Sequence, residues 1–253
     1  MLTKEILKEQ LFALGVREGM NLLVHSSLRK LGPIDGGADT VIDSLLELLG
    51  PAGTLMMSTV SGNVNRDQPV FHVELTPGTV GILSNIFRKR AGVIRSLHPV
   101  HSIAAFGPKA EFFCSGHLEA NTPWSEDSPY GKLMRNDGFI LFLGTNFRAN
   151  TCMHALEIEA RVPGLHTKES SSLYIYDYDG KWQEIQHHWH SPKQDNYTDM
   201  EQYVEKAGGL NYAAVGESIS RLCDARILRE TLLPIFKNTP ELAIRKTTDN
   251  DFI

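Results

Sequence analysis

The sequence contains little cysteine, with only Cys114, Cys152 and Cys223 among its 253 residues. Three scattered thiols cannot build the disulfide framework of a small secreted domain, and they match no cysteine-rich zinc motif. A chain of this length buries about three quarters of the surface of its unfolded state, so its core requires neither kind of stabilisation. The scarcity fits a reducing compartment, and we expect a cytoplasmic protein.

Long apolar runs are also missing. A membrane-spanning helix needs roughly 18 apolar residues in a row, and no segment comes near that length. The first residues, MLTKEILKEQLFAL, intersperse charged side chains among the apolar ones, unlike a secretory signal. We therefore expect neither a signal peptide nor a membrane partner.

Positive charge is not in excess, because 25 Lys and Arg residues stand against 30 Asp and Glu residues. A nucleic-acid partner would require a basic face, so none is expected. The motifs G-x-S-x-G, G-x-x-x-x-G-K-[ST] and G-x-G-x-x-G are absent as well. Their absence disfavours an α/β-hydrolase, a P-loop NTPase and a Rossmann dinucleotide-binding protein.

The apolar segments that are present alternate as in a layered α/β domain. A helix with a broad apolar face is predicted at Ala38–Leu49. Strands are predicted at 21–25, 54–59, 103–106 and 139–143, and a hairpin at 173–185 around Asp179-Gly180. The hairpin adds antiparallel strands, so the sheet is expected to be mixed. Beyond it, 198–206 and 215–237 are predicted to be helical. No repeat, low-complexity tract or linker appears, so we expect a single domain over residues 1–253.

The segment from Thr122 to Arg161 is the most informative part of the chain. Phe139–Leu143 is a short apolar run between two glycines, typical of a strand buried on both faces. A helix is predicted to follow from Asn150-Thr151, and His154 and Glu157, three residues apart, lie on one face of it. A histidine beside a carboxylate can act as a general base, and ligand sites in open α/β sheets lie beyond the strand ends.

Four segments, in this order, resemble the aminoglycoside 3-N-acetyltransferase family. They are VHSSLRKLGPIDGGADTVIDSLLELLGPAGTLMM (24–57), RSLHPVHSIAAFG (95–107), SPYGKL (128–133) and NTCMHALE (150–157). The resemblance implies an α/β/α layered sandwich with a central mixed β-sheet, and an acetyl-CoA-dependent N-acetyltransferase distinct from the GNAT fold. It also implies that His154 is the catalytic histidine.

The same resemblance assigns residues to the acetyl-CoA co-substrate. The HSSL segment, His25, Ser26, Ser27 and Leu28, is implied to lie along the pantetheine arm. A second cofactor-side motif supplies Arg95, Ser96, His98 and Ser102. An alternative phosphate site is the basic run Arg88–Arg90, which also suits the end of a predicted helix at 80–90.

The acceptor amine is less well defined by the sequence. Ser61–Val73 is predicted to be a polar, irregular loop, and Asp67 and Glu74 are the acidic residues between Ser61 and Leu75. They are our candidate substrate-binding residues. Resistance enzymes of the family carry a longer, more acidic insertion here. An aminoglycoside and a smaller amino sugar, such as a nucleotide-linked one used in surface-polysaccharide biosynthesis, therefore both stay open as acceptors.

Three hypotheses of mechanism remain at this point. In direct transfer, His154 removes a proton from the acceptor amine, Glu157 orients the imidazole, and the Thr151 hydroxyl contacts the thioester or its oxyanion. In a covalent route Cys152 would form an acyl-enzyme, although residues i and i+2 of a helix point about 200° apart. The third hypothesis is a catalytically silent CoA-binding protein.

The run Gln186–His190, which includes His187, His188 and His190, contains several potential metal ligands. No recognised spacing supplies a third ligand, so no metal is expected, and these side chains could instead border an acceptor pocket. The oligomeric state is not fixed by the sequence, and a homodimer stays open.

Overall fold

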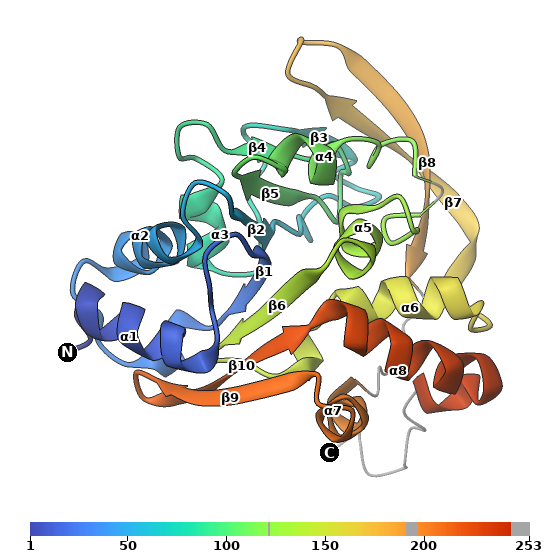
Figure 1. Cartoon of the computed structure of the whole chain (residues 1–253). Coiled ribbons are helices and arrows are strands. Elements are labelled where there is room, and N and C mark those ends of the chain that lie inside the picture. The colour runs from blue at the N-terminus through green and yellow to red at the C-terminus, as the bar shows by residue number, and fades with distance from the viewer. Residues whose placement is uncertain (121, 191–196, 244–253) are drawn as a thin grey trace, which may run out of the picture.

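The computed structural model describes residues 1–120, 122–190 and 197–243 (Figure 1). The helices of more than one turn are α1 (Lys4–Leu14), α2 (Gly37–Leu49), α3 (Ile82–Phe87), α4 (Ala110–Cys114), α5 (Pro129–Arg135), α6 (Cys152–Ala160), α7 (Tyr197–Lys206) and α8 (Ala225–Asn238). The strands are β1 (Asn21–Ser26), β2 (Thr54–Ser58), β3 (Val70–His72), β4 (Ile94–Arg95), β5 (Ile103–Phe106), β6 (Gly138–Leu143), β7 (His166–Tyr176), β8 (Trp182–His190), β9 (Leu210–Val215) and β10 (Ser218–Asp224). Short 3₁₀ turns are η1 (Leu28–Leu31), η2 (Phe147–Ala149) and η3 (Pro240–Ala243).

The main sheet has seven strands in the order β4-β5-β2-β1-β6-β10-β9. Its centre is parallel, because β1 pairs with β2 on one side and with β6 on the other in the same direction. The flanking strands run antiparallel to their neighbours. The carboxyl ends of β1, β2 and β6 therefore meet at one edge of the sheet, and the loops that follow them converge there.

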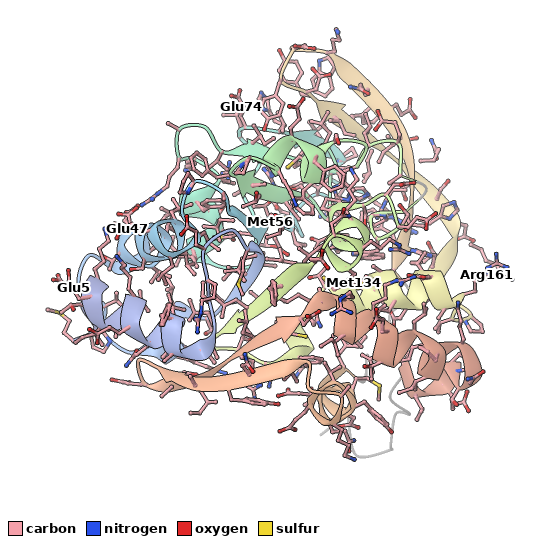
Figure 2. All side chains as sticks on the ribbon, viewed as in Figure 1. Glu5, Glu47, Met56, Glu74, Met134 and Arg161 are labelled. Carbon is pink, nitrogen blue, oxygen red and sulfur yellow. The ribbon has the colours of Figure 1, made fainter. Side chains whose placement is uncertain are left out.

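Two helical layers cover this sheet, because successive side chains of a strand point to opposite faces. Leu22 and Val24 of β1 pack into a core with α1, α2 and α3, whereas Leu23 between them joins a core with α4 to α8. The side chains fill both layers, with Met56 and Met134 labelled inside and Glu5 at the surface (Figure 2). The expected α/β/α layered sandwich with a mixed sheet is confirmed.

The predicted hairpin forms a second sheet, of three strands in the order β3-β7-β8. It projects from the upper right of the molecule in Figure 1. Gly180 at its turn has φ 74°, which glycine adopts without strain. The loop predicted at Ser61–Val73 is not wholly irregular, because Val70–His72 forms β3 beside β7. Phe71 of this short strand is fully buried under the hairpin, which explains the regular pairing.

The prediction for the carboxyl-terminal third was wrong in part. The helix expected at Val215–Lys237 starts only at Ala225, and the residues before it form the hairpin β9–β10 with Gly216 at its tip. Asp224 caps α8 by accepting from the amides of Arg226 and Ile227. The α3 helix is likewise shorter than predicted, at Ile82–Phe87. Within the described residues no helix has the length and apolar character needed to cross a membrane.

Candidate active site

Helix α6, which follows strand β6 in the chain, carries the residues with the most distinctive chemistry. Gly144 follows β6 with φ 68° and lies close to the backbone of Ser27, so the chain turns at a position where a side chain would clash. The Asn150 side chain accepts from the amide of Cys152 and so starts α6. The helix ends at Arg161 in the left-handed conformation. These local features fix α6 just beyond the central strand.

His154, Glu157 and Tyr197 form a compact hydrogen-bonded group. His154 Nδ1 lies 3.0 Å from Glu157 Oε2 and 2.6 Å from the Tyr197 hydroxyl oxygen. The Tyr197 hydroxyl donates to the same carboxylate oxygen at 2.8 Å. Glu157 is 1% exposed and His154 17% exposed, so the carboxylate is buried behind a partly open imidazole. This arrangement places a hydrogen on Nδ1 and leaves Nε2 as the basic nitrogen.

Aromatic side chains hold the His154 ring from its other sides. The ring of Trp124 lies 4.5 Å from that of His154, and the rings of His190 and Tyr197 approach edge-on at 4.7 Å and 5.3 Å. A positive charge on the imidazole would face the Trp124 π-system, which stabilises cations. These contacts hold the His154 ring in one orientation.

A pocket of about 160 Å³ lies at the edge where β1 and β2 end and α6 begins. Among its lining residues are three from the predicted set, His25, Ser26 and Thr151. Thr151 is three residues before His154, one turn of helix away. Burial lowers the pKa of His25 to about 4, so this ring lines the pocket as a neutral group. The structure thus brings a strand end, a hydroxyl pair and the catalytic candidate into one region.

The comparisons with known proteins address this combination of fold and site. Residues 23–236 match the family model described as aminoglycoside 3-N-acetyltransferase. Aminoglycoside N(3)-acetyltransferase IV of Salmonella sp is 32% identical over 246 residues, covering 94% of this chain and 91% of that protein. The chain belongs to the aminoglycoside 3-N-acetyltransferase family. Its homologues are N-acetyltransferases, and so is this protein.

Solved structures of the family share the fold over nearly the whole chain. A histidine-to-alanine mutant of aminoglycoside acetyltransferase AAC(3)-IVa, crystallised with a gentamicin, superposes with a TM-score of 0.85 at 31% identity, covering 97% of this chain and 92% of that one. The YokD protein from Bacillus subtilis gives 0.82 at 28% identity, with 95% of each chain covered.

In this acetyltransferase Arg95 lies in a buried network. The residue is 4% exposed, and all N–H groups of its guanidinium have partners within the protein. Nε donates to the hydroxyls of Thr59 and Ser102, and the two terminal nitrogens donate to three backbone carbonyls and to Ser61. In this conformation the guanidinium ties the segment 59–76 to the sheet and has no donor left for a phosphate.

The other residues of the second predicted cofactor motif are buried beside Arg95. Ser96 bonds His117 Nδ1 at 2.8 Å and accepts from the amide of Ile103. Ser102 bonds Thr59, and His98 Nδ1 accepts from two backbone amides of its own turn. This segment is thus separate from the pocket at Thr151. In the first motif, Ser27 and Leu28 are half-buried at the start of η1.

The basic run Arg88–Arg90 is occupied by contacts within the protein. Arg90 bridges Asp39 and Asp43 of α2, each at 2.5 Å. Arg88 donates to the carbonyl of Glu74 and to the side chain of Asn85. Two of its three cations thus hold α3 and the preceding loop in place.

The two predicted substrate residues are exposed and lie beside the far part of the hairpin. Asp67 precedes β3, and Glu74 follows it at the periphery of the molecule (Figure 2). His72, two residues before Glu74, pairs with Tyr176 of β7, ten residues from His166. Ten residues of strand span about 33 Å. Because His166 stacks near Trp124, the hairpin separates Glu74 from the His154 group.

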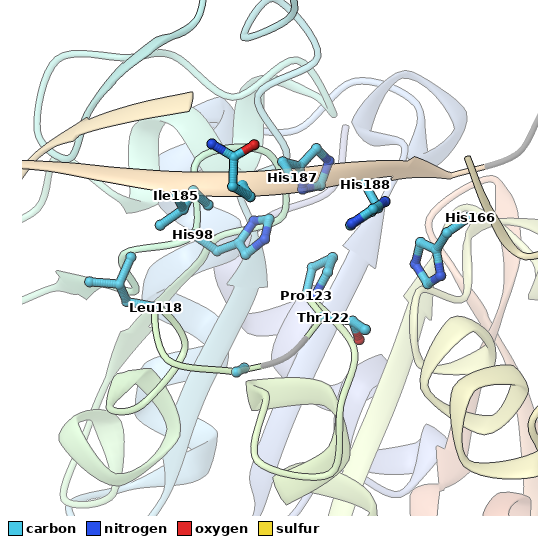
Figure 3. A pocket seen from close by; sticks show the side chains of 10 residues that line it. His98, Leu118, Thr122, Pro123, His166, Ile185, His187 and His188 are labelled. Carbon is cyan, nitrogen blue, oxygen red and sulfur yellow. The ribbon is translucent and has the colours of Figure 1, made fainter. Parts of the chain in front are cut away.

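Histidines gather around the site to an unusual degree. Ring contacts through Trp124 connect seven of the ten histidines, here called the histidine belt: His98, His101, His117, His154, His166, His187 and His190. A second pocket of about 160 Å³ opens beside the belt, with His98, His166 and His188 around it below β8 (Figure 3). Thr122 and Pro123, which precede Trp124, also line it, so it adjoins the His154–Glu157–Tyr197 group.

Tyr197 and Trp124 escaped the sequence-based prediction. Tyr197 is the first residue of α7 and lies 40 residues beyond Glu157, so no spacing rule connects them. Trp124 precedes the SPYGKL segment and carries no pattern of its own. His190 was identified only as part of a histidine-rich run. Each joins the site because of tertiary packing, which places the end of β8 and the start of α7 beside α6.

Substitution of Cys152 by serine tests the covalent route. Cys152 is fully buried, and burial raises the pKa of its thiol well above the ordinary value. A neutral, inaccessible thiol is a poor nucleophile. We expect the Cys152→Ser protein to keep kcat within about threefold of the wild type, measured by steady-state thiol release. Complete loss of turnover in a folded variant would instead support an acyl-enzyme.

Proposed function

We propose that the protein transfers the acetyl group of acetyl-CoA directly to an amine of an aminoglycoside, with His154 as the general base. The observation that carries the proposal is the His154–Glu157–Tyr197 group. It fixes Nδ1 against a buried carboxylate and leaves Nε2 for the acceptor. Family membership supplies the reaction class and favours an aminoglycoside acceptor.

The chemistry follows from the ordinary states of the reactants. An amine of pKa about 8 to 9 is mostly protonated at neutral pH, so it gains from a base at the moment of attack. The nitrogen lone pair forms a bond to the thioester carbonyl carbon while Nε2 of His154 takes the amine proton. Collapse of the tetrahedral intermediate breaks the carbon–sulfur bond, and the imidazolium returns the proton to the leaving thiolate. Glu157 and Trp124 stabilise the cation in the interval.

The donor is proposed to place its thioester at the pocket formed by His25, Ser26 and Thr151. This pocket is one helical turn from His154 and includes the side chain of Thr151. The Thr151 hydroxyl is suited to bond the oxyanion. Ser27 and Leu28, which follow Ser26 in the chain, are proposed to contact the donor beyond this pocket. Arg95, Ser96 and Ser102 are proposed to act indirectly, by holding segment 59–76 beside the pocket.

The acceptor is proposed to lie on the other side of His154, toward Trp124 and the histidine belt. The segment from Thr122 to Asp127 borders two pockets there. The larger, of about 750 Å³, has a wall of mixed charge, with the carboxylates Glu119, Glu126, Asp127 and Glu159 and the cations Lys132, Arg135 and Arg161. Arg135 pairs with Glu126 and Glu159, so Glu119 and Asp127 are the carboxylates proposed to bind an amine of the acceptor. Asp67 and Glu74 do not lie at this place. We further propose that residues 1–253 act as one domain, because β1, α6, β8 and α7 all contribute to the site.

A thiol-release assay with acetyl-CoA tests the proposal. The panel should contain aminoglycosides such as gentamicin and apramycin beside nucleotide-linked amino sugars. We expect turnover with at least one aminoglycoside and a product acetylated on an amine, identified by mass spectrometry. Turnover confined to nucleotide-linked amino sugars would move the function to glycan synthesis, and CoA binding without any turnover would favour a silent CoA-binding protein.

A further inference from the structure

Three potential metal ligands meet at the open side of the catalytic group. The ligand atoms of His154, Glu157 and His190 lie within 4.8 Å of one another. Two of these residues belong to α6, and the third is the last residue of β8. Among the residues that the structure describes, this is the one group of three or more His, Cys, Asp and Glu side chains with such spacing.

The buried carboxylate has an unused acceptor. Glu157 Oε2 accepts from Tyr197 and contacts His154, whereas Oε1 is buried and has no hydrogen-bond partner among the described residues. A buried carboxylate oxygen without a partner costs free energy. A cation beside Oε1 would remove that cost, which is a second and independent indication that the group can accept one.

We propose that a divalent transition-metal ion binds to His154, Glu157 and His190 and switches the acetyltransferase off. Two imidazoles and one carboxylate make a donor set that zinc uses with a fourth position open. A tetrahedral ion with bonds of about 2.1 Å holds its ligand atoms about 3.4 Å apart. Side-chain rotations that move the three ligand atoms by little more than about 1 Å would therefore bring them to this spacing. The Tyr197 hydroxyl supports the site by orienting Glu157.

The same donors select the kind of ion. Nitrogen donors suit Zn²⁺, Ni²⁺ and Cu²⁺, whereas Mg²⁺ and Ca²⁺ prefer oxygen ligands. His166, whose ring lies 6.4 Å from that of His190, has a buried Nε2 without a partner in the described structure. It lies outside the group of three ligand atoms within 4.8 Å, so it is not one of the proposed ligands. The sequence-based prediction was that catalysis requires no metal, and an ion that inhibits does not conflict with that prediction.

The inhibitory part of the proposal rests on the proposed function, because a metal bound to His154 blocks the reaction only if His154 is the general base. Binding is independent of it and is measured first. Tag-free, metal-free protein is titrated with Zn²⁺ against a chromophoric chelator, and Co²⁺ is used for its visible absorption. We expect one tight ion per chain, with the absorption of a low-coordinate Co²⁺ site. Mg²⁺ at the same concentrations should not compete.

His190→Ala identifies the site, and His188→Ala is its matched control on the same strand. Loss of a direct ligand is expected to weaken Zn²⁺ binding at least about 100-fold, since outer partners alone account for about 10- to 100-fold. The control should bind as tightly as the wild type. Circular dichroism confirms that both variants are folded. Equal, weak binding by all three proteins would overturn the site.

Thiol release with and without Zn²⁺ then tests the switch. We expect inhibition that saturates at one ion per chain and reverses on addition of EDTA. The His190→Ala variant should require a much higher Zn²⁺ concentration for the same inhibition. A tightly bound ion that leaves turnover unchanged would overturn the inhibitory role, but it would still support the metal-binding site. A protein that binds Zn²⁺ as expected but acetylates nothing would contradict the proposed function and not the metal site.

Discussion

Replacement of His154 by alanine is expected to lower kcat/KM for acetyl transfer about 10³-fold, because a general base contributes about 10²- to 10⁴-fold to such steps. The acceptor amine would then have to lose its proton to water. The loss should appear mainly in kcat, since the ring that is removed interacts most strongly with the transition state. Steady-state thiol release with acetyl-CoA and an aminoglycoside measures both constants.

The neighbouring residues provide graded controls for this result. Tyr197→Phe keeps the ring and removes one hydrogen bond to Glu157, so its effect should be smaller than that of His154→Ala. Near-ultraviolet circular dichroism of each variant shows whether packing around Trp124 is intact. If folded His154→Ala protein kept more than a tenth of the wild-type kcat/KM, His154 would not be the base.

Acidification from pH 7 to pH 4.5 is expected to unfold the protein. Burial lowers the pKa of His25, His117 and His187 to about 4 in the folded protein, against about 6.5 in an unfolded chain. Between these values the unfolded chain binds more protons, so the free energy of unfolding falls as the pH falls. Each such histidine lowers the free energy of unfolding by about 1.4 kcal/mol for each pH unit, and three together lower it by about 4 kcal/mol. A typical free energy of unfolding of about 5–15 kcal/mol is therefore lost when the pH falls by a few units.

Urea unfolding at pH 7.0, 6.0 and 5.0, followed by tryptophan fluorescence, measures this dependence. His117→Gln should reduce the slope of the free energy of unfolding against pH by the equivalent of about one proton. Glutamine does not ionise, and it can still bond Ser96, the partner of His117 Nδ1. The stability should be restored when the pH returns to 7. An unchanged free energy of unfolding between pH 7 and pH 5 would mean that these imidazoles accept protons in the folded state.

The centre of the fold could be predicted because its local signals agree with its tertiary environment. Phe139–Leu143 is apolar throughout, and it is a strand buried between two helical layers. Gly15 ends α1 in the left-handed conformation that is typical of a glycine directly after a helix. The His154–Glu157 pair followed from helix geometry alone, and their atoms are in hydrogen-bonding contact.

Other parts depended on partners distant in sequence. Residues 215–224 carry a mixed pattern, and they become strands because β10 pairs with β6 at the edge of the parallel centre. Arg95 has the chemistry of a phosphate ligand, yet burial beside Thr59 and Ser102 commits its donors to the protein. Tyr197 lacked any local signal. Side chains whose role depends on packing cannot be assigned from spacing.

The hairpin β7–β8 is attached to the body at both ends. The Tyr178 hydroxyl near its turn exchanges hydrogen bonds with the backbone N–H and C=O of Arg95, and His190 at the other end contacts His154. Between them, Leu173 and Ile185 face a buried cluster. Loss of one residue within either strand would turn these side chains to the opposite face. Homologous hairpins that keep this attachment are therefore expected to differ in length by two residues per strand, or at the turn. Such changes keep the same side chains facing the buried cluster between the Tyr178 contact and His154.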